Sequence, residues 1–369
     1  MRTVRRLLYR EVLSSVLFVV LAFLALFFFI DFVDQLEQVG KNGYTTLQAV
    51  WSCMLEIPGH LYELLPIAVL IGSIYALARL AQSSEYTILR TGGLGPARAL
   101  GLLAVLGLGF ALVTYVIGDY IAPWTEKLVS AMEARQRGGL ELGRSGTWLR
   151  DNQPGPDGER RYSVNIGAAV AHGELARVRI YEFGLRGDLL ARTTAARARV
   201  DRGGMWSLED VRISRWVADA AGQVHSEDQR LPELTWRGGL TSDVVAAAML
   251  PVKTMSTAAL YTYMSHLSEH EQAAQRYEIQ FWKKALYPFA CLVMMALALP
   301  FAYLRARAGG VSLKVFGGIM LGISFVLLNN VSSHLGLLRQ WTPWIAASMP
   351  SVIYLMLSMA AFQWLVRNR

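Results

Sequence analysis

A motif that resembles a zinc site is the first part of the sequence that could do chemistry. His266, Glu269 and His270 fit the pattern H-x-x-E-H, in which two histidines on one helix face bind Zn²⁺ and the glutamate acts as a base. A five-residue pattern arises easily by chance in a polar helix, and no third ligand is evident around this one. We therefore expect no catalytic residue and no metal in this chain, and we keep a membrane zinc hydrolase as an alternative function.

A glycine-rich segment is the second candidate, because glycine-rich loops can hold phosphate groups. The segment Gly92-Gly93-Leu94-Gly95-Pro96 lacks the lysine and the preceding strand of a phosphate-binding loop. The pattern G-x-x-x-x-G-K-[ST] occurs nowhere in the sequence. We expect no cofactor in this chain: if the protein depends on ATP, a partner subunit binds the ATP and its Mg²⁺.

The residues just before these glycines could contact such a partner. Ser83 and Ser84 suit the N-cap of a short helix that continues to Arg90. Glu85 is the only acid of this helix. The helix could dock a soluble motor or could be a solvated connector, and the residues alone leave both interpretations open.

Polar side chains inside an apolar segment are costly and need a reason. Asn329 and Asn330 lie within such a segment, where hydrogen bonds to neighbouring helices are favoured over a role in lining a cavity. The nearby Gly317, Gly318 and Gly322 would allow close approach of another helix.

The composition indicates which elements must position these residues. Hydrophobic residues make up 53% of the 369 and charged residues only 17%, whereas a soluble domain carries about 25% charged residues. The net charge is +8, but the arginines flank apolar runs and do not gather on one polar helix, so we expect no nucleic-acid partner. The two cysteines lack metal-ligand or redox spacing.

Six apolar segments approach the length of about 20 residues that a membrane-crossing helix needs. They lie near residues 12–30, 64–80, 99–121, 286–304, 315–333 and 344–366. The first is not expected to be a signal peptide, because Asp31-Phe32-Val33-Asp34 follows it in place of a small-residue cleavage site.

Lysine and arginine in the short loops predict the orientation of these segments. One set of loops, which includes both termini, holds most of these bases, whereas the other set holds only Lys41 and Arg339. The basic set should be cytoplasmic. We therefore expect both termini inside the cell and the large polar insert between the third and fourth segments outside.

The insert has the alternation of β-strands. Period-two segments at 178–183, 196–201 and 206–213 are separated by turns such as Arg202-Gly203-Gly204. This pattern predicts an all-β domain of the sandwich or jelly-roll type, in which the arginine-rich strands present a solvated face. From Thr257 to Lys284 an amphipathic helix should lead into the fourth span.

The expected fold is thus a polytopic α-helical membrane protein with six transmembrane helices and an inserted periplasmic, jelly-roll-like β domain. Residues 1–123 should hold the first three spans and the short helix near 81–91. Residues 124–256 should form the β domain, and residues 257–369 the amphipathic connector and the last three spans.

Several stretches resemble the YjgP/YjgQ family of lipopolysaccharide-export permeases. They are FVDQL at 32–36, LAQSSE at 80–85 with glycines at 92–93, Ala122-Pro123, residues 255–267, Arg276-Tyr277, FWK at 281–283 and Pro288. The resemblance spans the whole chain in the family's order, and the first stretch favours the LptG branch over the LptF branch.

The resemblance implies a permease subunit of an ABC transporter in the inner membrane of a Gram-negative bacterium. It implies a heterodimer with an LptF-like permease, two LptB-like ATPase subunits, an LptC-like protein and an LptA-like periplasmic protein. Lipopolysaccharide would be extracted from the outer leaflet and passed to a periplasmic bridge. Ser84, Glu85, Tyr86 and Arg90 would belong to the helix that couples to the ATPase.

The substrate residues follow less directly from the resemblance. Family members place a lysine, which contacts lipid A phosphates, where this chain has Asp31. Charge could come instead from the LptF-like partner or from bases of this chain, and Phe28, Phe29 and Phe32 could line a cavity or face lipid. The candidate substrate residues are Phe28, Phe29, Asp31, Phe32, Lys41, Lys127, Arg135, Arg137 and Asn329. A permease for another lipid or for lipoproteins is the further alternative.

Overall fold

A computed structural model describes most of the chain. It describes residues 2–40, 44–83, 85–91, 95–136, 140–141, 146–155, 158–169, 174–184, 187–218, 224–249, 255–269, 274–303 and 311–367. The chain forms two compact units. We call Met1–Val39, Thr45–Glu126 and Glu278–Arg369 the membrane unit, and Gly40–Tyr44 with Lys127–Tyr277 the insert unit.

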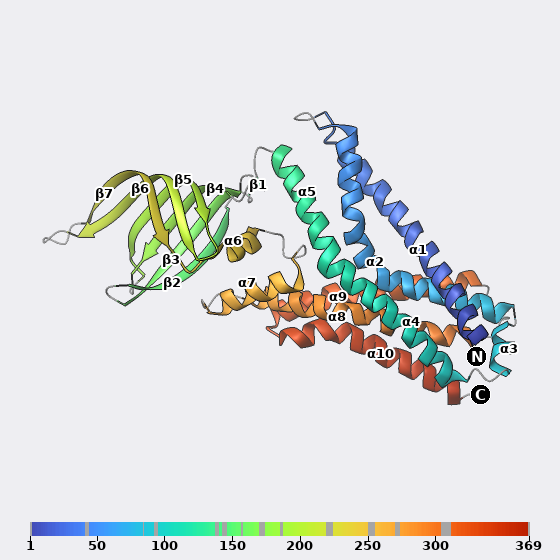
Figure 1. Cartoon of the computed structure of the whole chain (residues 1–369). Helices are drawn as coiled ribbons and strands as arrows, with labels where there is room; N and C mark the ends of the chain where they lie inside the picture. Colours follow the sequence, from blue (N-terminus) through green and yellow to red (C-terminus); the bar gives the residue numbers. More distant parts are fainter. Residues whose placement is uncertain are drawn as a thin grey trace. The chain divides into compact units, whose positions relative to one another are not determined.

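Six helical stretches of the described residues are long and apolar enough to cross a membrane. These are α1 (Arg2–Leu36), α2 (Thr46–Gln82), α4 (Pro96–Val116) with the π-helical turn η2 (Ile117–Ile121) and α5 (Ala122–Gln136), α8 (Gln275–Ala298) with η5 (Leu299–Ala302), α9 (Val311–Leu338) and α10 (Pro343–Arg367). The short helix α3 (Glu85–Thr91) follows α2. Six predicted spans are therefore confirmed (Figure 1).

The second span is longer than the sequence indicated. A capping box starts α2: the Thr45 side chain accepts a hydrogen bond from the Gln48 backbone, and the Gln48 side chain accepts one from the Thr45 backbone. The added turns before residue 64 carry Glu56, His60 and Glu63, which lower the hydropathy by which a span is recognised.

Helix α2 is the centre of the membrane unit. In its most apolar 18-residue window 78% of the residues are buried, against 11% in that of α1. α1 and α2 lie side by side (Figure 1), and the backbone of Val16 approaches Gly72 so closely that a Cβ added there would lie 2.6 Å from the Val16 Cα. The absence of a side chain at Gly72 therefore allows this contact.

Glycines also let α9 approach α2. The sequence predicts such a role for three glycines, and two of them lie at the contact. A Cβ at Gly318 would lie 2.7 Å from Ile74, and one at Gly322 would lie 2.7 Å from Ile67. A Cβ at Gly317 would meet no atom within 4 Å, so this glycine lies off the contact.

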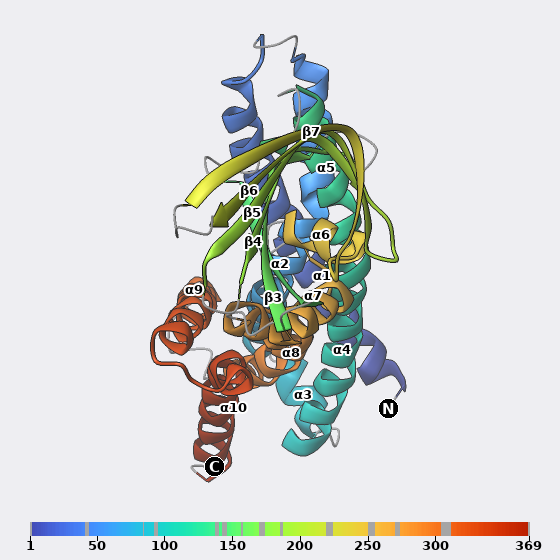
Figure 2. The same ribbon diagram turned by 90° about the vertical axis from the view of Figure 1, so that its left-hand side faces the viewer.

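The insert unit contains an antiparallel sheet in which β3 to β7 follow one another in chain order. The described strands are β1 (Leu140–Glu141), β2 (Thr147–Gly155), β3 (Gly158–Ala169), β4 (Leu175–Phe183), β5 (Leu189–Val200), β6 (Met205–Ala218) and β7 (Val224–Arg237). β1 and β2 both pair with β3, and each later strand pairs with the one before it. Figures 1 and 2 show the sheet strongly curved.

The sheet confirms the predicted inserted β domain, and the strand order shows how this domain is built. A jelly roll of two Greek keys places strands distant in sequence beside each other, whereas every described pairing joins consecutive strands, except that β1 pairs with β3. The tight turn predicted at Arg202-Gly203-Gly204 joins β5 to β6, and Gly204 has the positive φ of +78° that glycine tolerates.

The buried face of the sheet changes phase along its strands. Leu175 and Val178 are both buried, although they lie three residues apart and Arg177 between them has a φ of +56°. β6 repeats the pattern about Asp210, whose φ is +52°. Arg177 of β4 and Asp210 of β6 lie opposite the same position of β5, which runs between them. A left-handed residue on each strand thus turns the side chains on both sides of it toward one core.

The arginines of the strands pair with acids. Arg212 lies 2.6 Å from Asp228, Arg199 pairs with Glu174, and Arg160 pairs with Glu182. Hydrogen bonds from Ser214 and Arg212 lower the pKa of Asp228.

The helices α6 (Ser242–Met249) and α7 (Thr257–Glu269) follow the sheet in the insert unit. α6 packs near β2, and α7 contacts α6. Leu260, Tyr263 and Leu267 are buried. Ala274, just before α8, is not helical, so α7 and α8 are separate elements and not one helix to Lys284.

Candidate functional site

The short helix α3 presents one polar and one apolar side chain on the same side. Leu89 packs against the core of the membrane unit, whereas Glu85 is exposed and Ile88 is 68% exposed. Residues three apart lie on one helix face, so Glu85 and Ile88 form a face directed away from the core. We call these two residues the α3 face.

The other predicted coupling residues are described only in part. Tyr86 and Arg90 lie on α3, but their side chains are outside the described structure, and Ser84 lies outside it entirely. Glu85 lies in the first turn of α3, where a carboxylate interacts favourably with the helix dipole.

Aromatic residues cover the last turns of α1. Phe29 is 64% exposed, and the parallel rings of Phe28 and Phe32 have their centroids 6.3 Å apart. The ring of Phe27 lies 5.0 Å from the ring of His60 on α2. The predicted aromatic segment therefore presents an apolar surface on one side and contacts α2 on the other.

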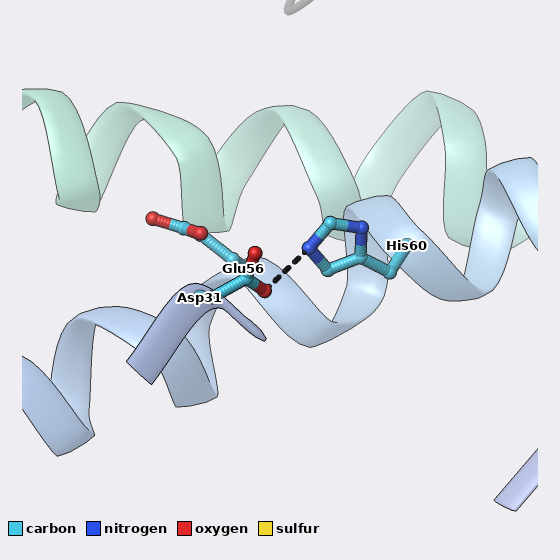
Figure 3. Close-up of side chains that lie close together, drawn as sticks. All are labelled: Asp31, Glu56 and His60. Atoms are coloured by element: carbon cyan, nitrogen blue, oxygen red, sulfur yellow. Dashed lines mark hydrogen bonds and ion pairs between the residues drawn. The ribbon is translucent and has the colours of Figure 1, made fainter. Parts of the chain in front are cut away.

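Asp31 belongs to a cluster of ionisable side chains between these two helices. Its Oδ2 atom lies 2.8 Å from Nε2 of His60. Glu56 lies one turn before His60 on α2, and the three residues offer ligand atoms that all lie within 4.8 Å of one another. Figure 3 shows the imidazole pointing at the Asp31 carboxylate, with Glu56 beside it. We call Asp31, Glu56 and His60 the α1–α2 cluster.

More charge surrounds this cluster within the membrane unit. Glu126 interacts electrostatically with Glu56, His60, Glu63 and Lys284, and its Oε2 atom is buried without a hydrogen-bond partner among the described residues. Its other carboxylate oxygen lies against the backbone of α2, 3.2 Å from where a Cβ at Gly59 would be.

A tyrosine pair borders the same region. The rings of Tyr62 and Tyr287 have their centroids 4.8 Å apart, and the Tyr287 hydroxyl donates a hydrogen bond of 2.6 Å to the backbone oxygen of Glu63. The Lys284 ammonium lies 6.0 Å from the centroid of the Tyr62 ring, at the outer limit of a cation–π contact.

Most of the basic residues predicted to contact a substrate phosphate are not described by the structure. Lys41 and Arg137 are not described, and Arg135 lies on α5 with its side chain undescribed. Lys127 is exposed on α5.

Asn329 and Asn330 take different positions on α9. Asn329 is 8% exposed, and its backbone oxygen accepts a hydrogen bond from Ser333. The Asn330 side chain accepts a hydrogen bond of 3.4 Å from Lys283 of α8. Asn330 thus links two helices, which is the packing interpretation favoured above.

The structure does not describe the histidine and glutamate side chains of the zinc-like motif. His266 and Glu269 lie on α7 with undescribed side chains, and His270 is not described. The motif therefore stays a pattern in the sequence.

Glu56 and His60 were not predicted as site residues. Their four-residue spacing places both on one face of α2. Ionisable residues in a membrane helix are rare enough to mark a site by themselves, but this part of α2 was not predicted to be helical.

Comparison with known proteins identifies the family. Residues 6–364 match the model of the lipopolysaccharide export system permease LptF/LptG. The chain is 26% identical over 363 residues to the lipopolysaccharide export system permease protein LptG of Escherichia coli K12, with 98% of this chain and 96% of the relative covered. It is 26% identical over 358 residues to LptG of Haemophilus influenzae, with 96% of each covered.

These relatives confirm the predicted LptG-type permease. The match runs through both groups of spans and through the insert between them. The chain belongs to the LptF/LptG family of lipopolysaccharide export system permeases.

Proposed function

We propose that this chain is the LptG-type permease subunit of an ATP-driven exporter that extracts lipopolysaccharide from the outer leaflet of the inner membrane and passes it to a periplasmic bridge. The observation that carries this proposal is the family match over residues 6–364. This match includes the six spans, the short helix α3 and the insert.

The surface of the membrane unit supports a role in sheltering a lipid. Moving one buried CH₂ group into water costs about 0.8 kcal/mol, so a lipid with several acyl chains needs apolar protein surface along its path. α1 is the least buried of the six spans and exposes Phe18 at 72% and Phe29 at 64%. An LptF-like permease facing α1 would complete a cavity that one chain cannot enclose.

The distribution of basic residues supports the orientation. Both terminal segments and the connection that holds α3 carry most of the lysines and arginines in the short loops. The termini and α3 would then be cytoplasmic, and the β-sheet of the insert unit would be periplasmic, where LptC-like and LptA-like proteins could extend it.

The α3 face is the proposed contact with the motor. The sequence has no phosphate-binding-loop motif, so ATP and Mg²⁺ would be bound by LptB-like subunits. Glu85 would accept hydrogen bonds from their basic side chains, and Ile88 would add apolar contact. Leu89 fixes α3 to the membrane core, so that movement of α3 is transmitted to the spans.

Energy from the motor is required by the thermodynamics of transport. A bound lipid can shift the permease only by its differential affinity for two conformations. ATP hydrolysis in the partner must therefore change which conformation, open or closed, is the more stable.

The coupling role of Glu85 can be tested by neutralising its charge. A hydrogen bond to a charged group contributes about 1.5–3 kcal/mol, so Glu85→Gln should weaken binding of the LptB-like ATPase by about 10-fold or more. The affinity of the purified permease pair for the ATPase measures this directly. Thr91→Ala is the matched control, because Thr91 is exposed on the same helix and its hydroxyl donates a hydrogen bond to Ile88 of α3.

The control should bind the ATPase as the unmodified chain does. Equal affinity for Glu85→Gln and Thr91→Ala would remove Glu85 from the contact. Folding is checked independently by the melting temperature of each variant in detergent.

A further inference from the structure

The α1–α2 cluster combines donor types that suit a transition metal. Asp31 and Glu56 offer carboxylate oxygens and His60 offers an imidazole nitrogen, all within 4.8 Å of one another. Imidazole with carboxylate favours first-row ions such as Zn²⁺ or Mn²⁺ over Mg²⁺ and Ca²⁺, which prefer oxygen ligands only. From this set we propose that Asp31, Glu56 and His60 form a binding site for one divalent first-row metal ion.

The geometry requires only small side-chain movements. Bonds of about 2.0–2.2 Å to the metal place neighbouring ligand atoms about 3–3.5 Å apart. The Asp31 and His60 atoms are already 2.8 Å apart, and their hydrogen bond would be exchanged for two metal bonds. Glu56 and His60 are one turn apart on α2, and Asp31 is held opposite them on α1 (Figure 3).

The charge around the cluster favours a cation. Asp31, Glu56, Glu63, Asp119 and Glu126 interact electrostatically with the residues of this region. Within the cluster itself, the two carboxylates of Asp31 and Glu56 stand against the single imidazole of His60.

A buried carboxylate oxygen of α5 is electrostatically coupled to the same cluster. Oε2 of Glu126 is buried without a hydrogen-bond partner among the described residues, and its carboxylate is electrostatically coupled to Glu56 and His60. A metal ion, or a water bound to it, would satisfy such an oxygen. Glu126 is therefore the candidate for an outer partner of the three ligands.

The position of the cluster makes it accessible. Asp31 lies five residues before the end of α1, and the side chains of Asp31 and His60 are 17% and 25% exposed. Three protein ligands leave a coordination position open for water or an anionic oxygen. If the chain handles lipopolysaccharide as proposed above, a headgroup phosphate could occupy that position; only this extension rests on the proposed function.

Zinc binding to the purified full chain tests the site without any lipid substrate. The chain is purified through a tag that lacks histidine, stripped with EDTA and titrated with ZnCl₂ in detergent, and bound zinc is measured by mass spectrometry after dialysis. One Zn²⁺ per chain is expected. Co²⁺ in place of Zn²⁺ should give a visible absorption spectrum typical of mixed nitrogen and oxygen ligands.

Variants locate the bound ion. His60→Ala and Glu56→Gln should each lower the affinity by at least about 10-fold, a loss in the range seen when metal ligation is disturbed. His334→Ala is the control, because His334 is an exposed histidine of the membrane unit on α9, and it should bind zinc normally. Glu56→Gln keeps the side-chain shape, so the test survives if His60→Ala fails to fold.

Three results would overturn the site. They are no zinc bound by the unmodified chain, zinc retained at full affinity by both cluster variants, or zinc lost on His266→Ala but not on Glu56→Gln. The last result would assign the metal to the H-x-x-E-H motif. None of these measurements depends on transport, so failure of the proposed function would leave them interpretable.

Discussion

A single buried indole joins two parts of the insert core. Trp206 is fully buried, its Nε1 donates a hydrogen bond of 3.1 Å to the backbone oxygen of Leu240, and its ring lies 5.8 Å from that of Trp236. The residue therefore holds the segment after β7 against the start of β6. Its contribution combines packing with a hydrogen bond that a phenylalanine in the same place cannot make.

Replacing this indole should destabilise the insert. Trp206→Phe leaves the Leu240 oxygen without its donor and opens a space, at a cost of about 2–4 kcal/mol. Trp148→Phe is the control, because Trp148 is 52% exposed and stacks on Tyr181; it should cost less than about 1 kcal/mol. Pulse proteolysis of the insert at increasing guanidinium concentrations, with the full chain, measures the loss in unfolding free energy for both variants. Equal costs would contradict the role given to Trp206.

Individual residues were the hardest part to predict from the sequence. The family resemblance makes Asp31 a candidate substrate contact in the place of a lysine, but nothing in the sequence links Asp31 to Glu56 or His60. Their proximity depends on how α1 packs against α2, and no spacing within one segment reveals a contact between two segments. Glu85 was found because a lone acid in a short polar connection is visible locally.

At the scale of elements, the contact between α1 and α2 depends on one glycine. A Cβ at Gly72 would lie 2.6 Å from the Val16 Cα and 2.7 Å from its nitrogen. These are backbone atoms of a helix, so they cannot yield as a flexible side chain would. The two helices would have to separate.

Alanine at this position should therefore lower stability. Gly72→Ala is expected to cost about 1–3 kcal/mol through overpacking. Gly109→Ala, on α4, meets no atom within 4 Å and should be neutral or stabilising by up to about 1 kcal/mol, because alanine favours the helix. The two melting temperatures in detergent should thus move in opposite directions. A drop of similar size in both would show that the packing of Gly72 is not special.

The elements were predictable where one pattern dominated. Apolar runs located six spans, and alternation located an all-β insert, because both follow from local periodicity. The sequence does not predict the first half of α2 as part of a span, because Glu56, His60 and Glu63 lower its hydropathy, although a capping box starts the helix. The order of the strands could not be read from the sequence, since alternation gives the face of a strand and not its partner.

At the scale of the whole molecule, the orientation in the membrane decides whether α3 can meet a cytoplasmic motor. Cysteine labelling tests it, because the native Cys53 and Cys291 are buried. A membrane-impermeant maleimide should label Glu227→Cys, on the exposed strand β7 of the insert, in cells with a permeabilised outer membrane. It should label Thr91→Cys on α3 only after the inner membrane is opened.

The reversed pattern would place the insert in the cytoplasm. α3 would then lie on the side of the membrane without ATP, and the proposed coupling through Glu85 would be impossible. The family assignment would stand, because it rests on the sequence match and not on orientation.

Transfer of lipopolysaccharide out of a sealed membrane is the activity that the proposed function requires. Proteoliposomes would hold this chain, its LptF-like partner, an LptC-like protein and the LptB-like ATPase together with lipopolysaccharide, and a soluble LptA-like acceptor would be added outside. Photocrosslinking of lipopolysaccharide to the acceptor is expected to rise with time when ATP is present, and to stay at background without ATP or without this chain. Crosslinking that is the same with and without this chain would contradict its role as the permease.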